Sequence, residues 1–151
     1  MSAFPAPTED ARHGTSELAE RYRAVRARSV ALAAPLSAED AMVQSMDDAS
    51  PAKWHLAHTT WFFEHFALGA DPDYVPMDAD WSYLFNSYYE AVGERHARPR
   101  RGMLSRPSLA RVLAHREAVD GLMAVLLRDA PPRVARIVEM GQQHEQQHQE
   151  L

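Results

Sequence analysis

The sequence predicts an all-α fold, an antiparallel four-helix bundle with one long crossover connection. Four stretches carry apolar residues at helical spacing, and capping residues or prolines bound them. No stretch alternates apolar and polar residues as a half-buried strand would. Prolines and glycines recur in residues 70–107, between the second and third of the predicted helices. A long link at that place is typical of bundles in which one connection crosses over.

The composition is that of an ordinary globular protein, and it argues against several functions. The apolar share is 46%, the charged share is 25%, and 151 residues suffice for one domain with its own core. The net charge is -5 and the only basic block is residues 98–101, so we expect no nucleic-acid partner. The chain has no cysteine, which excludes thiolate metal ligands and a cysteine nucleophile. It lacks a membrane-spanning apolar run and a signal peptide, so we expect a cytoplasmic location and no membrane partner.

The first long helix is predicted to begin at Thr15 or Ser16 and to end at Ala34. Pro35 stops it, because proline has no backbone N–H to continue the helical hydrogen bonds. Residues 37–40 then have the composition of a second helix start, which predicts a short element there.

The second long helix is predicted to run from Ser50 to Leu68. Ser50 is a capping residue, and Pro51 follows it at the position where a helix tolerates proline. Gly69 is a typical residue just past a helix end. Tryptophan and phenylalanine residues cover most of the helix circumference, which predicts a central, buried helix.

The third long helix is predicted to begin after Ser108, a capping residue, and to end at Pro131 and Pro132. Before it, residues 70–107 form the predicted long connection, with a short helix at residues 81–91.

The predicted domain organisation is a disordered lead-in, residues 1–14, followed by one helical domain, residues 15–151. The last helix begins near Arg133 and still runs at Leu151, with no glycine or proline to end it. We therefore expect the sequence to be the N-terminal part of a longer protein.

Two histidines in this last helix carry the strongest chemical signal. His144 and His148 are four residues apart, so their side chains lie one above the other on one helical face. They continue a stripe of seven-residue spacing through Val134, Ile137 and Gly141, which should face the bundle interior. Imidazole is a common transition-metal ligand, so the pair predicts a metal site. The alternative is a solvated, polar helix end.

A third ligand is needed, and the residues alone leave its identity open. The segment HEQQH matches H-E-x-x-H, in which Glu145 would be the general base of a zinc protease. That motif needs a ligand further on, and only three residues follow His148. The second helix offers three upstream histidines instead, and their spacing does not choose among them. These are His55, His58 and His65. We expect the remaining histidines, His13, His96 and His115, to be incidental residues at the bundle edge.

Four segments together resemble the ergothioneine-biosynthesis sulfoxide synthases, a family of non-haem iron enzymes. In order, they are SPAKWHLAHTTWFFE (50–64), YLFNSYYEAVG (83–93), RPRRGMLSRPSL (98–109) and HEQQHQEL (144–151). The resemblance covers residues 35–151 and implies the DinB-like helical domain at the N-terminus of that family. It also implies that three histidines bind one Fe(II) ion, namely His58, His144 and His148.

The resemblance further implies a reaction in which O2 is used to join a thiol sulfur to the imidazole of hercynine, giving a sulfoxide. The thiol would be cysteine or gamma-glutamylcysteine. Gln147 resembles the family's contact to the hercynine imidazole, and Tyr88 or Tyr89 would supply a proton. A C-terminal domain similar to formylglycine-generating enzymes would complete the pocket. The alternatives are a DinB-like zinc or nickel thiol transferase and a non-catalytic helical interaction module.

Overall fold

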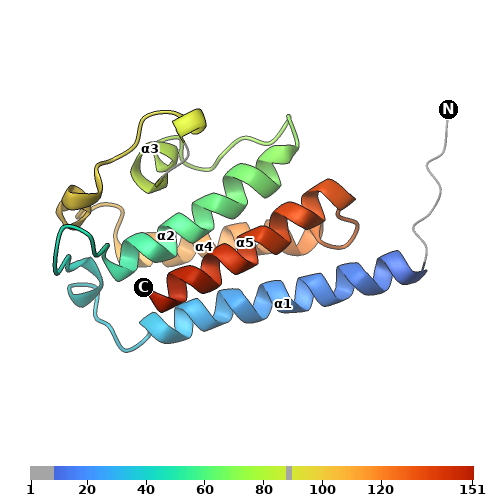
Figure 1. Ribbon diagram of the computed structural model, residues 1–151, viewed down its shortest axis with the longest axis horizontal. Coiled ribbons are helices and arrows are strands. Elements are labelled where there is room, and N and C mark those ends of the chain that lie inside the picture. The colour runs from blue at the N-terminus through green and yellow to red at the C-terminus, as the bar shows by residue number, and fades with distance from the viewer. Residues whose placement is uncertain (1–8, 88–89) are drawn as a thin grey trace.

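The computed structural model describes residues 9–87 and 90–151, and four long helices dominate it (Figure 1). The long helices are α1 (Glu9–Ala33), α2 (Ala52–Phe62), α4 (Leu109–Leu126) and α5 (Pro132–Glu150). The shorter ones are η1 (Asp40–Met42), η2 (Phe63–Ala67), η3 (Leu68–Ala70), α3 (Trp81–Phe85), η4 (Glu90–Val92) and η5 (Arg98–Met103). No strand occurs in the described part of the chain, so the predicted all-α bundle is confirmed.

The predicted long crossover, residues 70–107, contains α3, η4 and η5 and leads from η3 to α4 along one side of the bundle (Figure 1). It lets α4 run in the same direction as α2, while α1 and α5 run together in the opposite direction. Side-chain amides of α5 hold it along α1: Gln142 donates to the Leu18 carbonyl, and Gln149 donates to the Val25 carbonyl. None of the described helices is both long enough and apolar enough to cross a bilayer.

The core is built around α2 and the π-helical turn η2 that continues it. Trp54, Trp61, Phe62 and Phe63 are each at most 2% exposed. This confirms the predicted central helix, since its aromatic residues meet neighbours on all sides. Gly141 of α5 lies against the rings of Phe62 and Phe63, where a side chain would collide with them. The absence of a side chain therefore brings α5 close to α2.

Two of the predicted helix starts need correction. Helix α1 begins at Glu9, ahead of the predicted start at Thr15 or Ser16. Pro51, not Ser50, is the N-cap of α2, and the Ser50 hydroxyl accepts a hydrogen bond of 2.8 Å from Arg101. Ser108, in contrast, caps α4 as predicted: its hydroxyl accepts from the Arg111 N–H at 3.1 Å.

Candidate metal centre

Helices α2 and α5 bring three histidines together: His58, His144 and His148. The Nε2 atom of His144 lies 3.1 Å from Nε2 of His58 and 3.1 Å from Nε2 of His148. One ligand atom from each residue lies within 4.8 Å of the other two, a spacing that could hold one metal ion. The structure thus selects His58 from the three histidines that spacing left open.

His58 is held rigidly by its surroundings. It is 1% exposed, and the indole of Trp54 stacks on its ring at 4.5 Å with an interplanar angle of 13°. Its Nδ1 lies 2.5 Å from the Phe85 carbonyl oxygen. A carbonyl can only accept, so Nδ1 carries the proton and Nε2 keeps its lone pair. A second hydrogen bond of this kind is the usual way in which a protein orients a metal-binding histidine.

The polar end of α5 is not a solvated helix end, because one face of it is buried. Gln142 is 4% exposed and Glu145 is fully buried. The Glu145 carboxylate forms ion pairs with Arg26 of α1, at 3.0 Å, and with Arg116 of α4. Burial would raise the pKa of Glu145, but the two guanidinium groups outweigh burial and lower it. This buried network fixes the rotation of α5 about its axis and so turns His144 and His148 toward α2.

The same network shows that the zinc-protease alternative is wrong for Glu145. A general base must reach a water molecule or substrate at the metal. Glu145 instead points to the other face of α5. There its carboxylate oxygens accept hydrogen bonds from two arginines and, at 2.6 Å, from the Ser29 hydroxyl.

The histidines of the cluster are neutral at physiological pH. Burial, together with the neighbouring His144 and His55, lowers the pKa of His148 to about 3. Burial also lowers the pKa of His144, and it holds the pKa of His58 well below its usual range, with added repulsion from His148 and His144. Neutral imidazole is the form that binds a metal, so the site presents its ligands ready for coordination.

The donor set fits a divalent transition metal. Three Nε2 atoms converge, and His58 brings a lone pair rather than a proton. A single proton on Nε2 of His144 could satisfy one neighbour well but not both. A cation at the point of convergence would satisfy all three. Imidazole ligands suit iron, zinc and nickel, and a set of three leaves coordination positions open for substrates.

A cavity of about 780 Å³ opens beside the three histidines. Arg101 of η5 lies in its wall with its guanidinium carbon 3.4 Å from the centre of the Trp54 ring. Burial, together with the nearby Arg98 and Arg95, lowers the pKa of Arg101 to about 10, so the side chain remains a cation at neutral pH. Its Nε is buried and has no hydrogen-bond partner among the described residues. The positive charge of Arg101 in the cavity wall favours binding of an anionic group next to the metal position.

The other predicted site residues are placed as follows. Gln147 is exposed and lines the cavity, as its predicted contact to a substrate requires. Tyr88 and Tyr89 lie outside the described residues. His65 stacks on Trp61 at 5.3 Å and does not belong to the cluster.

Of the histidines expected to be incidental, His96 and His115 contribute no ligand to the cluster. His96 binds the Arg100 carbonyl at 2.9 Å, and His13 lies in α1. His115 is not at the bundle edge, because it is buried and its Nε2–H donates to the Glu64 carboxylate at 2.7 Å.

Two residues that line the cavity were not identified from the sequence as parts of the site. Arg101 was grouped with its neighbours as a short basic stretch, and His55 was only one of three equivalent ligand candidates. Arg101 reaches Trp54 across 47 positions of chain, and no local pattern signals such a contact. His55 precedes His58 by one helical turn, and that spacing could have indicated a supporting role.

Comparison with known proteins agrees with this architecture. The family model of the DinB superfamily matches residues 21–151, which include all of α2, α4 and α5 and about half of α1. None of the curated proteins searched matches the chain.

Proposed function

The chain belongs to the DinB superfamily, and from that premise we propose that it is the iron-binding domain of an O2-dependent sulfoxide synthase acting on hercynine. The metal ligands are His58, His144 and His148. The metal is Fe(II), and the second organic substrate is cysteine or gamma-glutamylcysteine.

One observation carries the proposal: all four segments that resemble the sulfoxide synthases contribute to the wall of one cavity. The first supplies Trp54 and His58, and the second supplies Ser87. The third supplies Arg98 and Arg101, and the fourth supplies the metal pair with Gln147. Among these residues, Trp54 and His148 are 94 positions apart in the chain. Their convergence is expected if the residues that carry the resemblance serve one reaction.

The proposed reaction consumes one thiol, one hercynine and one O2. A carbon–sulfur bond forms as the thiol loses its S–H hydrogen and the imidazole loses a C–H hydrogen. One oxygen atom enters the sulfoxide, and the other leaves as water with the two hydrogens. Bound Fe(II) supplies the redox chemistry with O2 that side chains cannot supply.

The chain's own residues then bind and orient the substrates. Hercynine and both thiols carry carboxylates, and Arg98 and Arg101 give the cavity the matching charge. We assign Gln147 to the hercynine imidazole and Tyr88 or Tyr89 to proton delivery. A C-terminal domain resembling formylglycine-generating enzymes would complete the pocket.

The test is turnover by the full-length protein, including the proposed C-terminal domain, reconstituted anaerobically with Fe(II). Hercynine and O2 are added with cysteine or gamma-glutamylcysteine, and sulfoxide is measured by mass spectrometry. We expect product with one of the thiols, none from His58→Ala, and wild-type amounts from His65→Ala, which removes an imidazole outside the cluster.

Absence of sulfoxide with both thiols would contradict the proposal. Tightly bound zinc together with thiol transfer that consumes no O2 would instead identify the zinc or nickel transferase. If wild type and the His58→Ala variant bound no metal, the helical interaction module would remain.

A further inference from the structure

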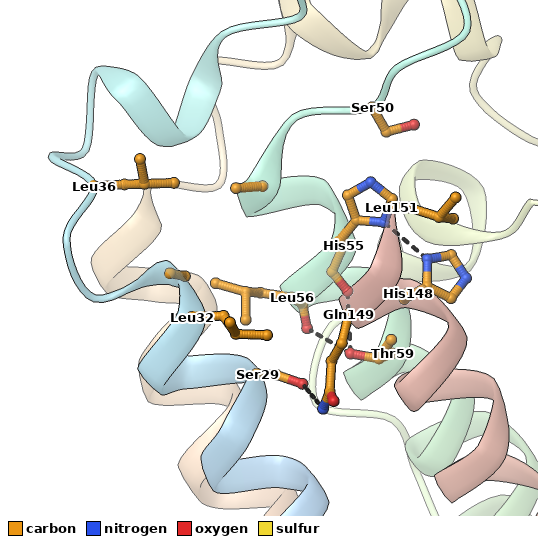
Figure 2. A pocket seen from close by; sticks show the side chains of 12 residues that line it. Ser29, Leu32, Leu36, Ser50, His55, Leu56, Thr59, His148, Gln149 and Leu151 are labelled. Carbon is orange, nitrogen blue, oxygen red and sulfur yellow. Dashed lines mark hydrogen bonds between the residues drawn. The ribbon is translucent and has the colours of Figure 1, made fainter.

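A fourth histidine, His55, contacts the three-histidine cluster through His148, on the side of the His148 ring opposite His144. Its Nδ1 lies 2.8 Å from Nδ1 of His148, and Figure 2 shows the two rings facing each other across this contact. Two ring nitrogens at this distance must share one proton, with one donating and the other accepting. Which ring holds the proton decides which nitrogen of His148 is free for a metal.

The second nitrogen of His148 determines the direction of this hydrogen bond. Nε2 of His148 lies 3.1 Å from Nε2 of His144, where the imidazoles of the cluster converge. A ligand to a metal at this point needs a lone pair on Nε2, so the proton of a neutral His148 is on Nδ1. Nδ1 of His55 then accepts this proton's hydrogen bond, and a neutral His55 carries its own proton on Nε2.

We propose that His55 is a positioning residue that holds His148 in the Nδ1–H form, with the lone pair of His148 Nε2 directed at the point where the three imidazoles converge. The hydrogen bond runs from Nδ1–H of His148 to Nδ1 of His55. This inference rests on the metal centre of the proposed function. His55 does for His148 what the Phe85 carbonyl does for His58.

The geometry also keeps His55 out of the ligand set. Its Nδ1 faces the outer nitrogen of His148, whereas the ligand atoms of the cluster are the three converging Nε2 atoms. The His55–His148 pair lies between the cavity of the cluster and a smaller groove of about 200 Å³, since both rings line both spaces. A partner in this place orients a ligand without binding the metal.

Two variants at His55 separate the effect of losing the hydrogen-bond acceptor from the effect of losing the volume of the ring. His55→Asn places an amide oxygen near the position of Nδ1 and can still accept from His148. His55→Leu fills the space but accepts nothing. Zn(II) and Co(II) affinities are measured by competition with a chelator, so the readout does not depend on turnover. We expect His55→Leu to bind either metal roughly 10–100-fold more weakly, and His55→Asn to recover most of the affinity. His65→Leu is the matched control and should bind as wild type does.

A direct measurement uses wild-type protein loaded with Zn(II) and labelled with nitrogen-15 at histidine. Nitrogen shifts should show His148 protonated at Nδ1 and His55 protonated at Nε2, with no zinc on either nitrogen of His55. This readout decides the question even if His55→Leu does not fold.

Three results would overturn the positioning role: wild-type affinity in His55→Leu, a proton on Nε2 of His148, or zinc bound to His55. His148→Ala separates this failure from a failure of the metal centre. If His148→Ala loses metal while His55→Leu keeps it, only the role of His55 is wrong. If His148→Ala also keeps its metal, the metal centre itself is wrong.

Discussion

Gly141 sets the distance between α5 and α2, and replacing it with alanine should damage both stability and metal binding. An added Cβ would lie 2.5 Å from Cε1 of Phe63 and 2.9 Å from Cε1 of Phe62. Carbon atoms in contact normally lie about 3.5–4.0 Å apart, so the helix or the rings must move by about 1 Å. Both rings are at most 1% exposed and have no free space to enter.

The energies can be compared directly. Overpacking a core costs about 1–3 kcal/mol, whereas alanine gains up to about 1 kcal/mol over glycine inside a helix. Because the added Cβ meets two buried rings at once, we take the upper part of the overpacking range, about 2–3 kcal/mol. We therefore expect Gly141→Ala to lose about 1–2 kcal/mol of unfolding free energy, a Tm lower by about 2–8 °C. Displacing α5 also draws His144 away from His58, so Zn(II) affinity should fall by roughly tenfold or more.

Gly121→Ala is the matched control, because Gly121 lies inside α4 with nothing within 4 Å of the added Cβ. The unfolding free energy of this variant should rise by up to about 1 kcal/mol from helix propensity alone, and the variant should bind zinc as wild type does. Thermal unfolding of metal-free protein and chelator competition measure the two effects. The reasoning fails if Gly141→Ala is as stable as wild type, or if the two variants shift Tm in the same direction.

The remaining predictions concern charged groups. Glu145→Gln should lower the unfolding free energy in urea by about 3–5 kcal/mol, because it leaves Arg26 and Arg116 without their shared anion; unchanged stability with lost turnover would restore Glu145 as a catalytic base. Arg101→Met should raise KM for the carboxylate-bearing thiol by roughly 10–100-fold, through loss of a charged hydrogen bond, and an unchanged KM would remove Arg101 from substrate binding. Burial alone would raise the pKa of Glu64, but hydrogen bonds from His115, Met77 and Tyr74 lower it below 4.5. The unfolding free energy of wild type should therefore exceed that of Glu64→Gln by its full amount well above pH 4.5, and this difference should disappear as the pH falls below 4.5. A difference that persists in acid would contradict this.

The sequence was sufficient for features that depend on neighbours in the chain. The four-residue spacing of His144 and His148 placed both on the face that meets α2. Ser108 was predictable as a cap, since its partner is the backbone N–H of Arg111, three residues on. The aromatic content of α2 likewise predicted its burial.

Features that depend on distant partners were not predictable in the same way. Serine often caps helices, yet the hydroxyl of Ser50 accepts a hydrogen bond from Arg101, 51 residues away. Glu145 fits a catalytic motif, and only the arginines of α1 and α4 show that it faces away from the metal position. Spacing within one helix cannot show which side chains of two other helices meet it.

The central claim is that His58, His144 and His148 hold one metal ion, and elemental analysis of anaerobically purified protein tests it most directly. After loading with Fe(II) and removal of excess metal, we predict one iron per chain in wild type and in the His65→Ala control. We predict loss of that iron in the single alanine variants of the three ligands. Wild-type iron in His58→Ala, or equal loss in His65→Ala, would contradict the account.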